Sequence, residues 1–364
     1  MKKIGREVLF IATSENNARN GEDSFIRLKD GRIMHAYTKF ISNSWDDGAT
    51  ADIVANYSVD NGETWSEEKI IIEHTSSARN AMCANLVRLG NGDLGIMYLR
   101  KMDETQNVRI ELIRSADEGV TWSDPVRIPF VEDSYYVIEN DHLIKLSSGK
   151  LLLPMNHHPY VRTNEEGKKI FNGHGKMTFA ASDDDGKTWY NLSDEYDLPY
   201  PEISGTGLQE TVVYEKLDGT LRAFSRTDLL CQYESISNDS GKTWSMPKPN
   251  TFFTSPTSPL NIKRIGNGNL VAVFNPKPGM PAYDPDNTRN NNWGRTPFVI
   301  AVSSDDGKTF SKVYYIEDDL TNGYCYPSIF DGGDFLLIGY YHSNGTGIPL
   351  NSNKVVKINY DELD

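Results

Sequence analysis

The octapeptide Ser58-Val-Asp60-Asn-Gly62-Glu-Thr64-Trp65 belongs to a pattern, Ser-x-Asp-x-Gly-x-Thr-Trp, that occurs five times in this chain, with Phe as the final residue of the last copy. Successive copies lie 57, 67, 55 and 66 residues apart. Self-similarity at such a period predicts an array of equivalent supersecondary units. The aspartates of the five copies are Asp60, Asp117, Asp184, Asp239 and Asp305.

Each octapeptide predicts a self-contained turn. An aspartate at the start of a tight turn accepts hydrogen bonds from backbone N–H groups further along, and glycine takes a position with positive φ. The final aromatic residue can then cover the apolar side of the turn. We call this element the Asp turn.

A second repeat raises the number of units to six. It consists of two apolar strands around a glycine, often as Asp-Gly or Asn-Gly, which is typical of short β-hairpins. Six hairpins and five Asp turns predict about four strands per unit. The sixth unit lacks an Asp turn, and we expect residues 8–11 to complete it by pairing with residues 335–341 and 354–358. The hairpin glycines are Gly31, Gly92, Gly149, Gly219, Gly268 and Gly333.

These repeats predict an all-β fold, a six-bladed β-propeller with four-stranded antiparallel blades, which leaves only short sheet edges. The length of 364 residues alone would allow two or three domains. Because a propeller is one closed unit, we expect a single domain over residues 1–364. The 38% hydrophobic and 11% aromatic residues suffice for its core.

Charge and cysteine content exclude several classes of function. The net charge of −14 disfavours nucleic acid as a partner. The three cysteines, Cys83, Cys231 and Cys325, are widely spaced and odd in number, which fits neither a zinc site nor a full disulfide framework. We expect no cofactor, no metal and no membrane span. A cytoplasmic protein is expected, or a secreted one if a signal peptide was removed; the oligomeric state stays open.

The Asp turns and the six hairpins together resemble the Asp-boxes (BNR repeats) of the sialidase, or neuraminidase, superfamily, and the likeness covers the whole chain. Asp-boxes carry no chemistry and also occur in non-catalytic propellers. The resemblance implies a retaining glycosidase with a Tyr nucleophile, a Glu that polarises it, an Asp acid/base and three arginines that bind the substrate carboxylate. A neutral Tyr avoids the repulsion between that carboxylate and an anionic nucleophile.

Three residues match the centre of this set. Glu210 opens an apolar strand in a Gln-Glu pair that is similar to the family's Asn-Glu, and Arg226 ends the partner strand of that hairpin. The segment from Tyr326 to Ile329, Tyr-Pro-Ser-Ile, resembles the family's Tyr-Ser-x-Leu around the nucleophile. Tyr324 is the alternative, because residues two apart share a face of an extended strand.

The acid/base and a further arginine are assigned by position. Asp47 lies five residues before Asp52, as in the family's Asp-His-Gly-x-x-Asp-Ile-Val, with Asp46 as the alternative. Arg295 precedes the strand that enters the fifth Asp-box, where the resemblance implies an arginine. Trp293 beside it is a candidate platform for a sugar ring.

The chain departs from the family at the first arginine, because it lacks the Arg-Ile-Pro motif. Hairpin spacing places that arginine near Gly21, and only Arg19 or Lys39 could replace it. Losing a bidentate carboxylate clamp changes recognition geometrically as well as electrostatically. Nearby acids and histidines could instead bind sugar hydroxyls, and no third ligand accompanies the adjacent histidines for a metal. These residues are Glu22, Asp23, His35, His157 and His158.

The sequence therefore predicts an exo-acting glycoside hydrolase that releases a terminal sialic acid-like or other terminal sugar from a glycan or glycoside. The alternatives are a non-catalytic carbohydrate-binding propeller and, less favoured, a protein-interaction propeller, which would not need the combination of Glu210, Arg226, Arg295 and Tyr326.

Overall fold

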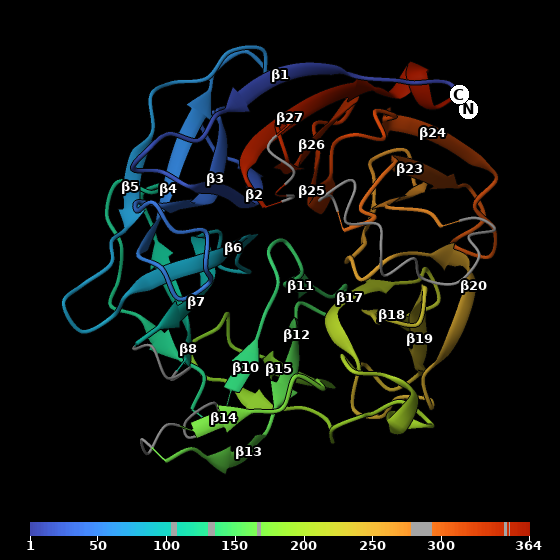
Figure 1. Ribbon diagram of the computed structural model, residues 1–364. Coiled ribbons are helices and arrows are strands. Elements are labelled where there is room, and N and C mark those ends of the chain that lie inside the picture. Colours follow the sequence, from blue (N-terminus) through green and yellow to red (C-terminus); the bar gives the residue numbers. More distant parts are fainter. Residues whose placement is uncertain (103–107, 130–134, 166–168, 278–292, 346–347, 349) are drawn as a thin grey trace.

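The chain forms a ring of β-sheets around a central axis (Figure 1). The computed structural model describes all residues except 103–107, 130–134, 166–168, 278–292, 346–347 and 349. Strands dominate the described part, and its helices are two short 3-10 turns, η1 (Pro201–Ile203) and η3 (Tyr360–Leu363). No helix among the described residues has the length and apolar composition needed to cross a bilayer.

The blades follow one another along the chain, each running from the axis to the rim. The first is β2 (Arg19–Arg27), β3 (Ile33–Phe40), β4 (Ala51–Ser58) and β5 (Lys69–Ile72), and the second is β6 (Asn80–Arg88), β7 (Leu94–Lys101), β8 (Val108–Ser115) and β9 (Val126–Arg127). One parallel bridge, between Ala51 and Asn80, joins these two blades into an eight-stranded sheet.

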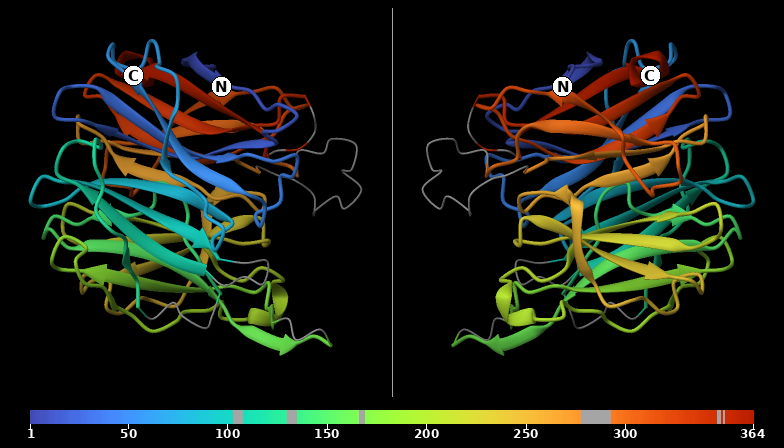
Figure 2. Two further views of the ribbon diagram at one scale, coloured as in Figure 1. Left: turned by 90° about the vertical axis from the view of Figure 1, so that its left-hand side faces the viewer. Right: turned by 90° about the vertical axis from the view of Figure 1, so that its right-hand side faces the viewer.

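The third blade contains β12 (Leu151–His158), β15 (Lys176–Ser182) and β16 (Tyr190–Asn191), with β10 (Tyr135–Val137) and β11 (Ile144–Lys145) both paired to β12 on its inner side. Its insertion, β13 (Tyr160–Thr163) and β14 (Lys169–Phe171), projects from the ring (Figure 2).

The fourth blade is β17 (Gln209–Glu215), β18 (Leu221–Arg226), β19 (Cys231–Ser237) and β20 (Lys248–Thr254). The fifth is β21 (Asn261–Arg264), β22 (Leu270–Phe274), β23 (Phe298–Ser303) and β24 (Lys312–Glu317).

The two ends of the chain close the ring within the sixth blade, as the sequence predicts. This blade is β25 (Tyr324–Asp331), β26 (Phe335–His342), β27 (Ser352–Asn359) and, outermost, the N-terminal strand β1 (Arg6–Ile11), which pairs antiparallel with β27. The closure leaves no open end in the ring.

Both repeats have the predicted local structure. The six hairpin glycines all have positive φ, between 84° and 101°. In the first Asp-box, Thr64 N–H and its hydroxyl donate to Asp60 at 2.9 and 2.6 Å, and Gly62 N–H donates to Ser58 Oγ at 2.8 Å. The other four copies repeat these bonds. The Asp-boxes therefore stabilise turns locally, and none of their residues lines the pocket described below.

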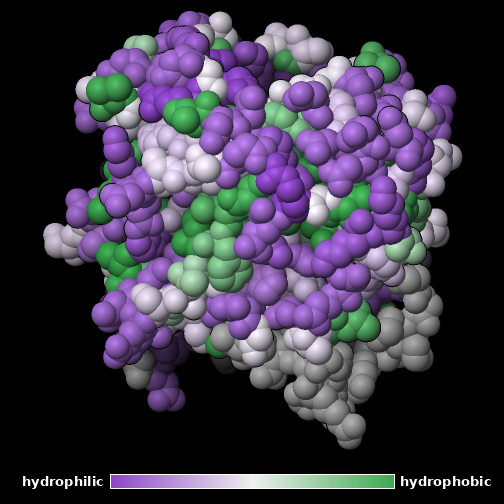
Figure 3. All heavy atoms as spheres, turned by 90° about the horizontal axis from the view of Figure 1, so that it is seen from above, coloured by the Kyte–Doolittle hydropathy of each residue, from purple (hydrophilic) through white to green (hydrophobic). Residues whose placement is uncertain are grey.

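The core lies between adjacent blades. Phe179 of the third blade stacks on Trp244 of the fourth Asp-box with ring centroids 4.4 Å apart, and both are buried. Further apolar clusters contain residues of neighbouring blades and pack them together. Seen edge-on, the surface is mostly hydrophilic with smaller hydrophobic areas (Figure 3), in keeping with the net charge of −14.

Candidate active site

Four innermost strands carry a β-bulge that turns one side chain toward the axis. The bulges lie in β2, β6, β17 and β25. At each of them one residue that is not glycine has positive φ: Glu22 (54°), Cys83 (60°), Glu210 (47°) and Tyr326 (57°). Bulges of this kind re-aim side chains beside active sites, and the strained φ is kept where surrounding structure enforces it.

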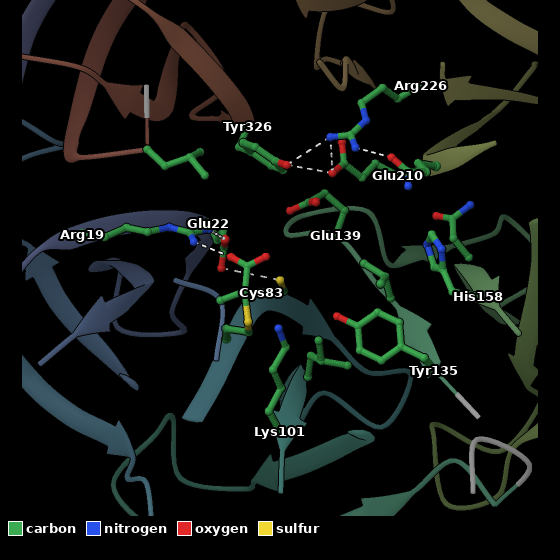
Figure 4. Close-up of a pocket in the computed structure, with 17 residues that line it drawn as sticks. Arg19, Glu22, Cys83, Lys101, Tyr135, Glu139, His158, Glu210, Arg226 and Tyr326 are labelled. Atoms are coloured by element: carbon green, nitrogen blue, oxygen red, sulfur yellow. Dashed lines mark hydrogen bonds and ion pairs between the residues drawn. The ribbon is translucent and has the colours of Figure 1, made fainter. Parts of the chain in front are cut away.

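These four side chains line one pocket of about 210 Å³ at the centre of the ring (Figure 4). Its wall also contains Arg19, Asp47, Lys101, Glu139 and Arg226, with apolar surface from residues such as Met82 and Leu99. A small concave site with a few convergent polar groups is typical of ligand binding.

Tyr326 and Glu210 are in direct contact. The Tyr326 hydroxyl donates to Glu210 Oε1 at 2.7 Å, and Arg226 donates to the same oxygen at 2.5 Å and to the Tyr326 hydroxyl at 3.2 Å. Burial raises the pKa of Tyr326 well above its ordinary value and Glu210 raises it further, whereas Arg226 and Arg295 oppose the rise. The phenol therefore stays protonated at rest, and Glu210 is the base placed to take its proton.

Arg295 lies under the Tyr326 ring. Its guanidinium carbon is 5.3 Å from that ring's centroid and 5.1 Å from that of Trp293. It donates to Cys325 Sγ at 3.1 Å and to the Thr257 carbonyl at 3.0 Å, and no carboxylate of the described residues is within 4.0 Å. Trp293 itself is half exposed, and neither it nor the buried Arg295 is among the residues that line the pocket.

Arg19 reaches the pocket despite the missing Arg-Ile-Pro motif. The bulge at Glu22 places two residues of β2, Glu22 and Asp23, opposite one residue of β3, which shifts the register on the side of Arg19 by one residue. Its guanidinium is bound to Glu22 and Asp47, and its Nε donates to Tyr341 at 2.7 Å. Desolvation raises the pKa of Asp47, but Arg19 and Lys101 together outweigh that effect and the pKa falls to about 2. In this state Asp47 is ionised and Arg19 is neutralised by two carboxylates.

Glu139 is a third carboxyl on this side of the tyrosine, and sequence reasoning missed it. Its side chain points into the pocket between Glu210 and Glu22 (Figure 4). Burial raises the pKa of Glu139 well above its ordinary value, and the neighbouring Glu210 and Glu22 raise it further. This rise favours the protonated form of Glu139, in which the carboxyl can donate a hydrogen bond.

The wall across the pocket from Tyr326 contains Cys83, Lys101, Tyr135 and His158 (Figure 4). Burial lowers the pKa of His158 to about 4, so its ring is neutral near pH 7. Burial also raises the pKa of the Cys83 thiol, with Glu22 adding to the rise, which keeps it from acting as a thiolate.

Two further predicted residues, Tyr324 and Lys39, lie away from the pocket. The expectation that Tyr324 shares a face with Tyr326 is wrong, because the bulge at Tyr326 breaks the alternation of β25. Tyr324 is fully buried, packs against Phe298 and donates to the Asp319 carbonyl at 3.2 Å. Lys39 is also outside the pocket wall and pairs with Glu68. The residue before it in β3, Thr38, faces inward and donates a hydrogen bond to Glu22, so Lys39 lies on the other face of the strand.

Some of the remaining polar candidates line the pocket and others lie away from it. Glu22 and His158 line the pocket. Asp23 and His35 are bonded to each other at 2.9 Å in the buried interior below it. His157 pairs with Glu195, and Asp46 accepts a hydrogen bond from Gly48 N–H in a turn. Among the described residues no group of three or more His, Cys, Asp or Glu side chains is arranged to hold a metal ion.

One sequence signal could have identified part of the pocket. Glu22, Cys83 and Glu210 each lie nine residues before the glycine of their hairpin. Aligning the hairpins by their glycines therefore places Glu22 and Cys83 at the same position as Glu210, which indicates that they too face the central axis. Lys101 and Glu139 have no comparable local pattern, because Lys101 is the last residue of β7 and Glu139 lies in the loop after β10.

The fold and this pocket together define a sialidase-superfamily propeller. The chain belongs to the BNR repeat-like domain family, which it matches over residues 31–342. It is 26% identical over 246 residues to the anhydrosialidase of Macrobdella decora, a match that covers 63% of this chain and 29% of that protein. The chain thus matches less than a third of the length of this curated relative.

Solved structures share the fold at low sequence identity. The intramolecular trans-sialidase of Ruminococcus gnavus superposes with a TM-score of 0.71 at 14% identity, over 98% of this chain and 97% of that chain. A protein of unknown function from Dyadobacter fermentans gives 0.69 at 17% identity, over 97% and 99% of the two chains. The leech intramolecular trans-sialidase, solved with 2,7-anhydro-Neu5Ac, gives 0.71 at 14% identity over 100% and 71%.

Proposed function

We propose that residues 1–364 form one exo-acting, retaining glycoside hydrolase domain that releases a terminal sialic acid-like sugar from a glycan or glycoside. The hydrogen bond between Tyr326 and Glu210, with Arg226 on both partners, carries this proposal. A neutral nucleophile paired with a general base is the arrangement needed when the anomeric carbon bears a carboxylate.

In the first step, Tyr326 Oη bonds to the anomeric carbon as its proton passes to Glu210. The bond to the leaving oxygen breaks, and Asp47 donates a proton to that oxygen. In the second step, Asp47 takes a proton from water, the water oxygen bonds to the anomeric carbon, and the Tyr326 oxygen leaves and regains its proton from Glu210. The same carbon is inverted twice, so the configuration is retained.

Asp47 must change state to serve as the acid. With a pKa of about 2 in its contact with Arg19, it is ionised near neutral pH. A substrate that covers Asp47 and draws Arg19 away from it would raise that pKa. We therefore propose that substrate entry, rather than the resting pocket, sets up the acid.

The substrate carboxylate is assigned to Arg226 and Arg295. Arg226 shares its charge with Glu210, and Arg295 has no carboxylate partner among the described residues. Arg19 contributes little to carboxylate binding while Glu22 and Asp47 neutralise it. We therefore expect weaker activity on standard aryl sialosides than three available arginines would support.

Phenol release from a panel of aryl glycosides, aryl sialosides included, tests the proposal. We expect turnover of an acidic glycoside by the wild-type protein and none by Tyr326→Phe. Proton NMR of the first-formed product should show retention, and inversion would exclude a covalent Tyr326 intermediate. The same spectra separate hydrolysis from formation of an anhydro sugar. Binding of a sugar without any turnover would identify a non-catalytic carbohydrate-binding propeller instead.

A further inference from the structure

Lys101 is the one pocket cation that the proposed reaction does not use. It ends β7 and lines the pocket with only 6% of its surface exposed. Its ammonium group points toward the pocket centre, between Cys83 and Tyr135 (Figure 4). Its stem lies in a wall with Met82 and Leu99, both buried.

The charge of Lys101 is not matched by a close carboxylate. No carboxylate oxygen of the described residues lies within 4.0 Å of its Nζ. Asp47 is bound to Arg19, and the polar neighbour of Lys101 is Tyr135, which is hydrogen-bonded to it and whose ring centroid lies 6.0 Å from Nζ. Burial lowers the pKa of Lys101, but Tyr135, Asp47 and Cys83 outweigh it, so the pKa stays above its ordinary value and the group is charged at neutral pH.

A buried ammonium without an ion-pair partner costs stability. The other cations of the pocket wall are paired: Arg19 with Glu22 and Asp47, and Arg226 with Glu210. A charge that lacks a close ion-pair partner and is directed into a cavity can bind a ligand group of the opposite charge there.

We propose that Lys101 binds an anionic substituent of the sugar, remote from the anomeric carbon, so that the pocket selects sugars with two negatively charged groups. Lys101 belongs to the second blade, whereas Arg226 and Tyr326 belong to the fourth and sixth blades across the pocket, and Arg295 lies against the Tyr326 ring. A ligand with its anomeric carboxylate at Arg226 and Arg295 therefore presents a distant substituent to Lys101. This inference takes only the orientation of the sugar from the proposed function, with the anomeric carboxylate at Arg226 and Arg295.

Binding constants measured by calorimetry test the assignment. The ligands are N-acetylneuraminic acid, its esters with one sulfate on O4, O8 or O9, and inorganic sulfate. The proteins are the wild type, Lys101→Met, Lys101→Arg and a matched control, Lys187→Met, which changes an exposed lysine of an Asp-box. None of these ligands is a glycoside, so the measurement does not depend on turnover.

We expect at least one sulfate ester to bind the wild type about tenfold more tightly than the unsulfated sugar, a gain of about 1.4 kcal/mol. Lys101→Met should abolish that gain, Lys101→Arg should keep part of it, and Lys187→Met should keep all of it. Absence of the gain for every ester, or its persistence in Lys101→Met, would overturn the proposal. Inorganic sulfate binding as tightly as the ester would overturn the assignment to a sugar substituent.

Stability gives an independent readout. Because Lys101 forms no close ion pair, Lys101→Met leaves no carboxylate without its partner, and its Tm should stay close to that of the wild type. A clearly lower Tm would show that Lys101 serves packing, and Lys101→Gln would then repeat the binding test in a folded protein. Lys101-dependent binding without turnover of any aryl glycoside would refute the hydrolase and keep this inference, whereas turnover with binding independent of Lys101 would do the reverse.

Discussion

The hydroxyl of Tyr326 donates a 2.7 Å hydrogen bond to Oε1 of Glu210, although 116 positions separate the two residues in the chain. Both side chains leave bulged strands at residues with positive φ. The second oxygen of Glu210 is buried and has no hydrogen-bond partner in the described part of the chain. The contact is thus held by strained backbone on both sides, as is common where geometry serves a reaction.

Removing either partner of this contact should strongly reduce turnover without unfolding the protein. We expect Glu210→Gln to lower kcat about 10² to 10⁴-fold, because general-base assistance contributes that much. Tyr326→Phe should lose at least as much, and the double variant should lose little more, since the two groups act in one step. Tyr324→Phe is the matched control: it alters a buried tyrosine outside the pocket and should retain activity. A Tyr324→Phe variant as inactive as Tyr326→Phe would contradict the assignment.

The ion pair of Arg19 and Glu22 should stabilise the folded protein only when both residues are present, so that removing one should cost more than removing both. Each has about 2% of its surface exposed, so Arg19→Met leaves a buried carboxylate without its counter-charge. We expect a loss of about 3–5 kcal/mol in the free energy of unfolding, measured by urea denaturation. Adding Glu22→Gln to the Arg19→Met variant should restore much of the lost free energy of unfolding.

The exposed pair of Arg6 and Glu63 provides the comparison for this cycle. Arg6→Met should cost no more than about 1 kcal/mol, because solvent screens such pairs. Equal costs for the two arginine substitutions would show that burial does not govern the Arg19 contact.

Asp-boxes should affect stability and not catalysis. Asp184→Ala removes the bonds from Thr188 N–H and hydroxyl at 2.9 and 2.6 Å. We expect a loss of about 1 kcal/mol or slightly more in the free energy of unfolding, with kcat per folded molecule unchanged. Asp194→Ala, at an exposed position nearby, should change neither quantity. A large loss of turnover in Asp184→Ala at unchanged stability would mean that this turn also shapes the pocket.

His142 should make the protein less stable in mild acid. Burial lowers its pKa to about 3 in the folded state, against about 6.5 in an unfolded chain. The unfolded state therefore binds more protons between these values, and stability falls as the pH drops below about 6.5, by up to about 1.4 kcal/mol per pH unit. His142→Gln should flatten the dependence by about one proton when unfolding is compared near pH 6 and near pH 4. If the wild type and His142→Gln showed the same change of unfolding free energy with pH, the titrating group would be another residue, for example His158.

The repeats of the sequence predict the architecture because their physics is local. Eight residues contain every donor and acceptor of an Asp-box, and a glycine with positive φ terminates each hairpin, so six units can be counted before any long-range contact is known. Likeness of short motifs also predicts the positions of Glu210, Arg226 and Tyr326 in the chain. Strand alternation fails at Tyr324, because it assumes an unbroken strand and β25 is bulged.

The sequence by itself thus determined the number of blades, the turns between strands, and the pairing of the chain's ends in the sixth blade. Only the tertiary structure decided which side chains meet at the axis. Arg19 reaches the pocket from the start of β2, next to the bulge at Glu22. Glu139 and Lys101 reach it from the third and second blades. Their charges depend on neighbours such as Glu22, Glu210 and Tyr135, which lie near them only after the ring has closed. Local hydrogen bonds and φ preferences are encoded over a few residues, whereas the electrostatics of a pocket is a property of groups far apart in the chain.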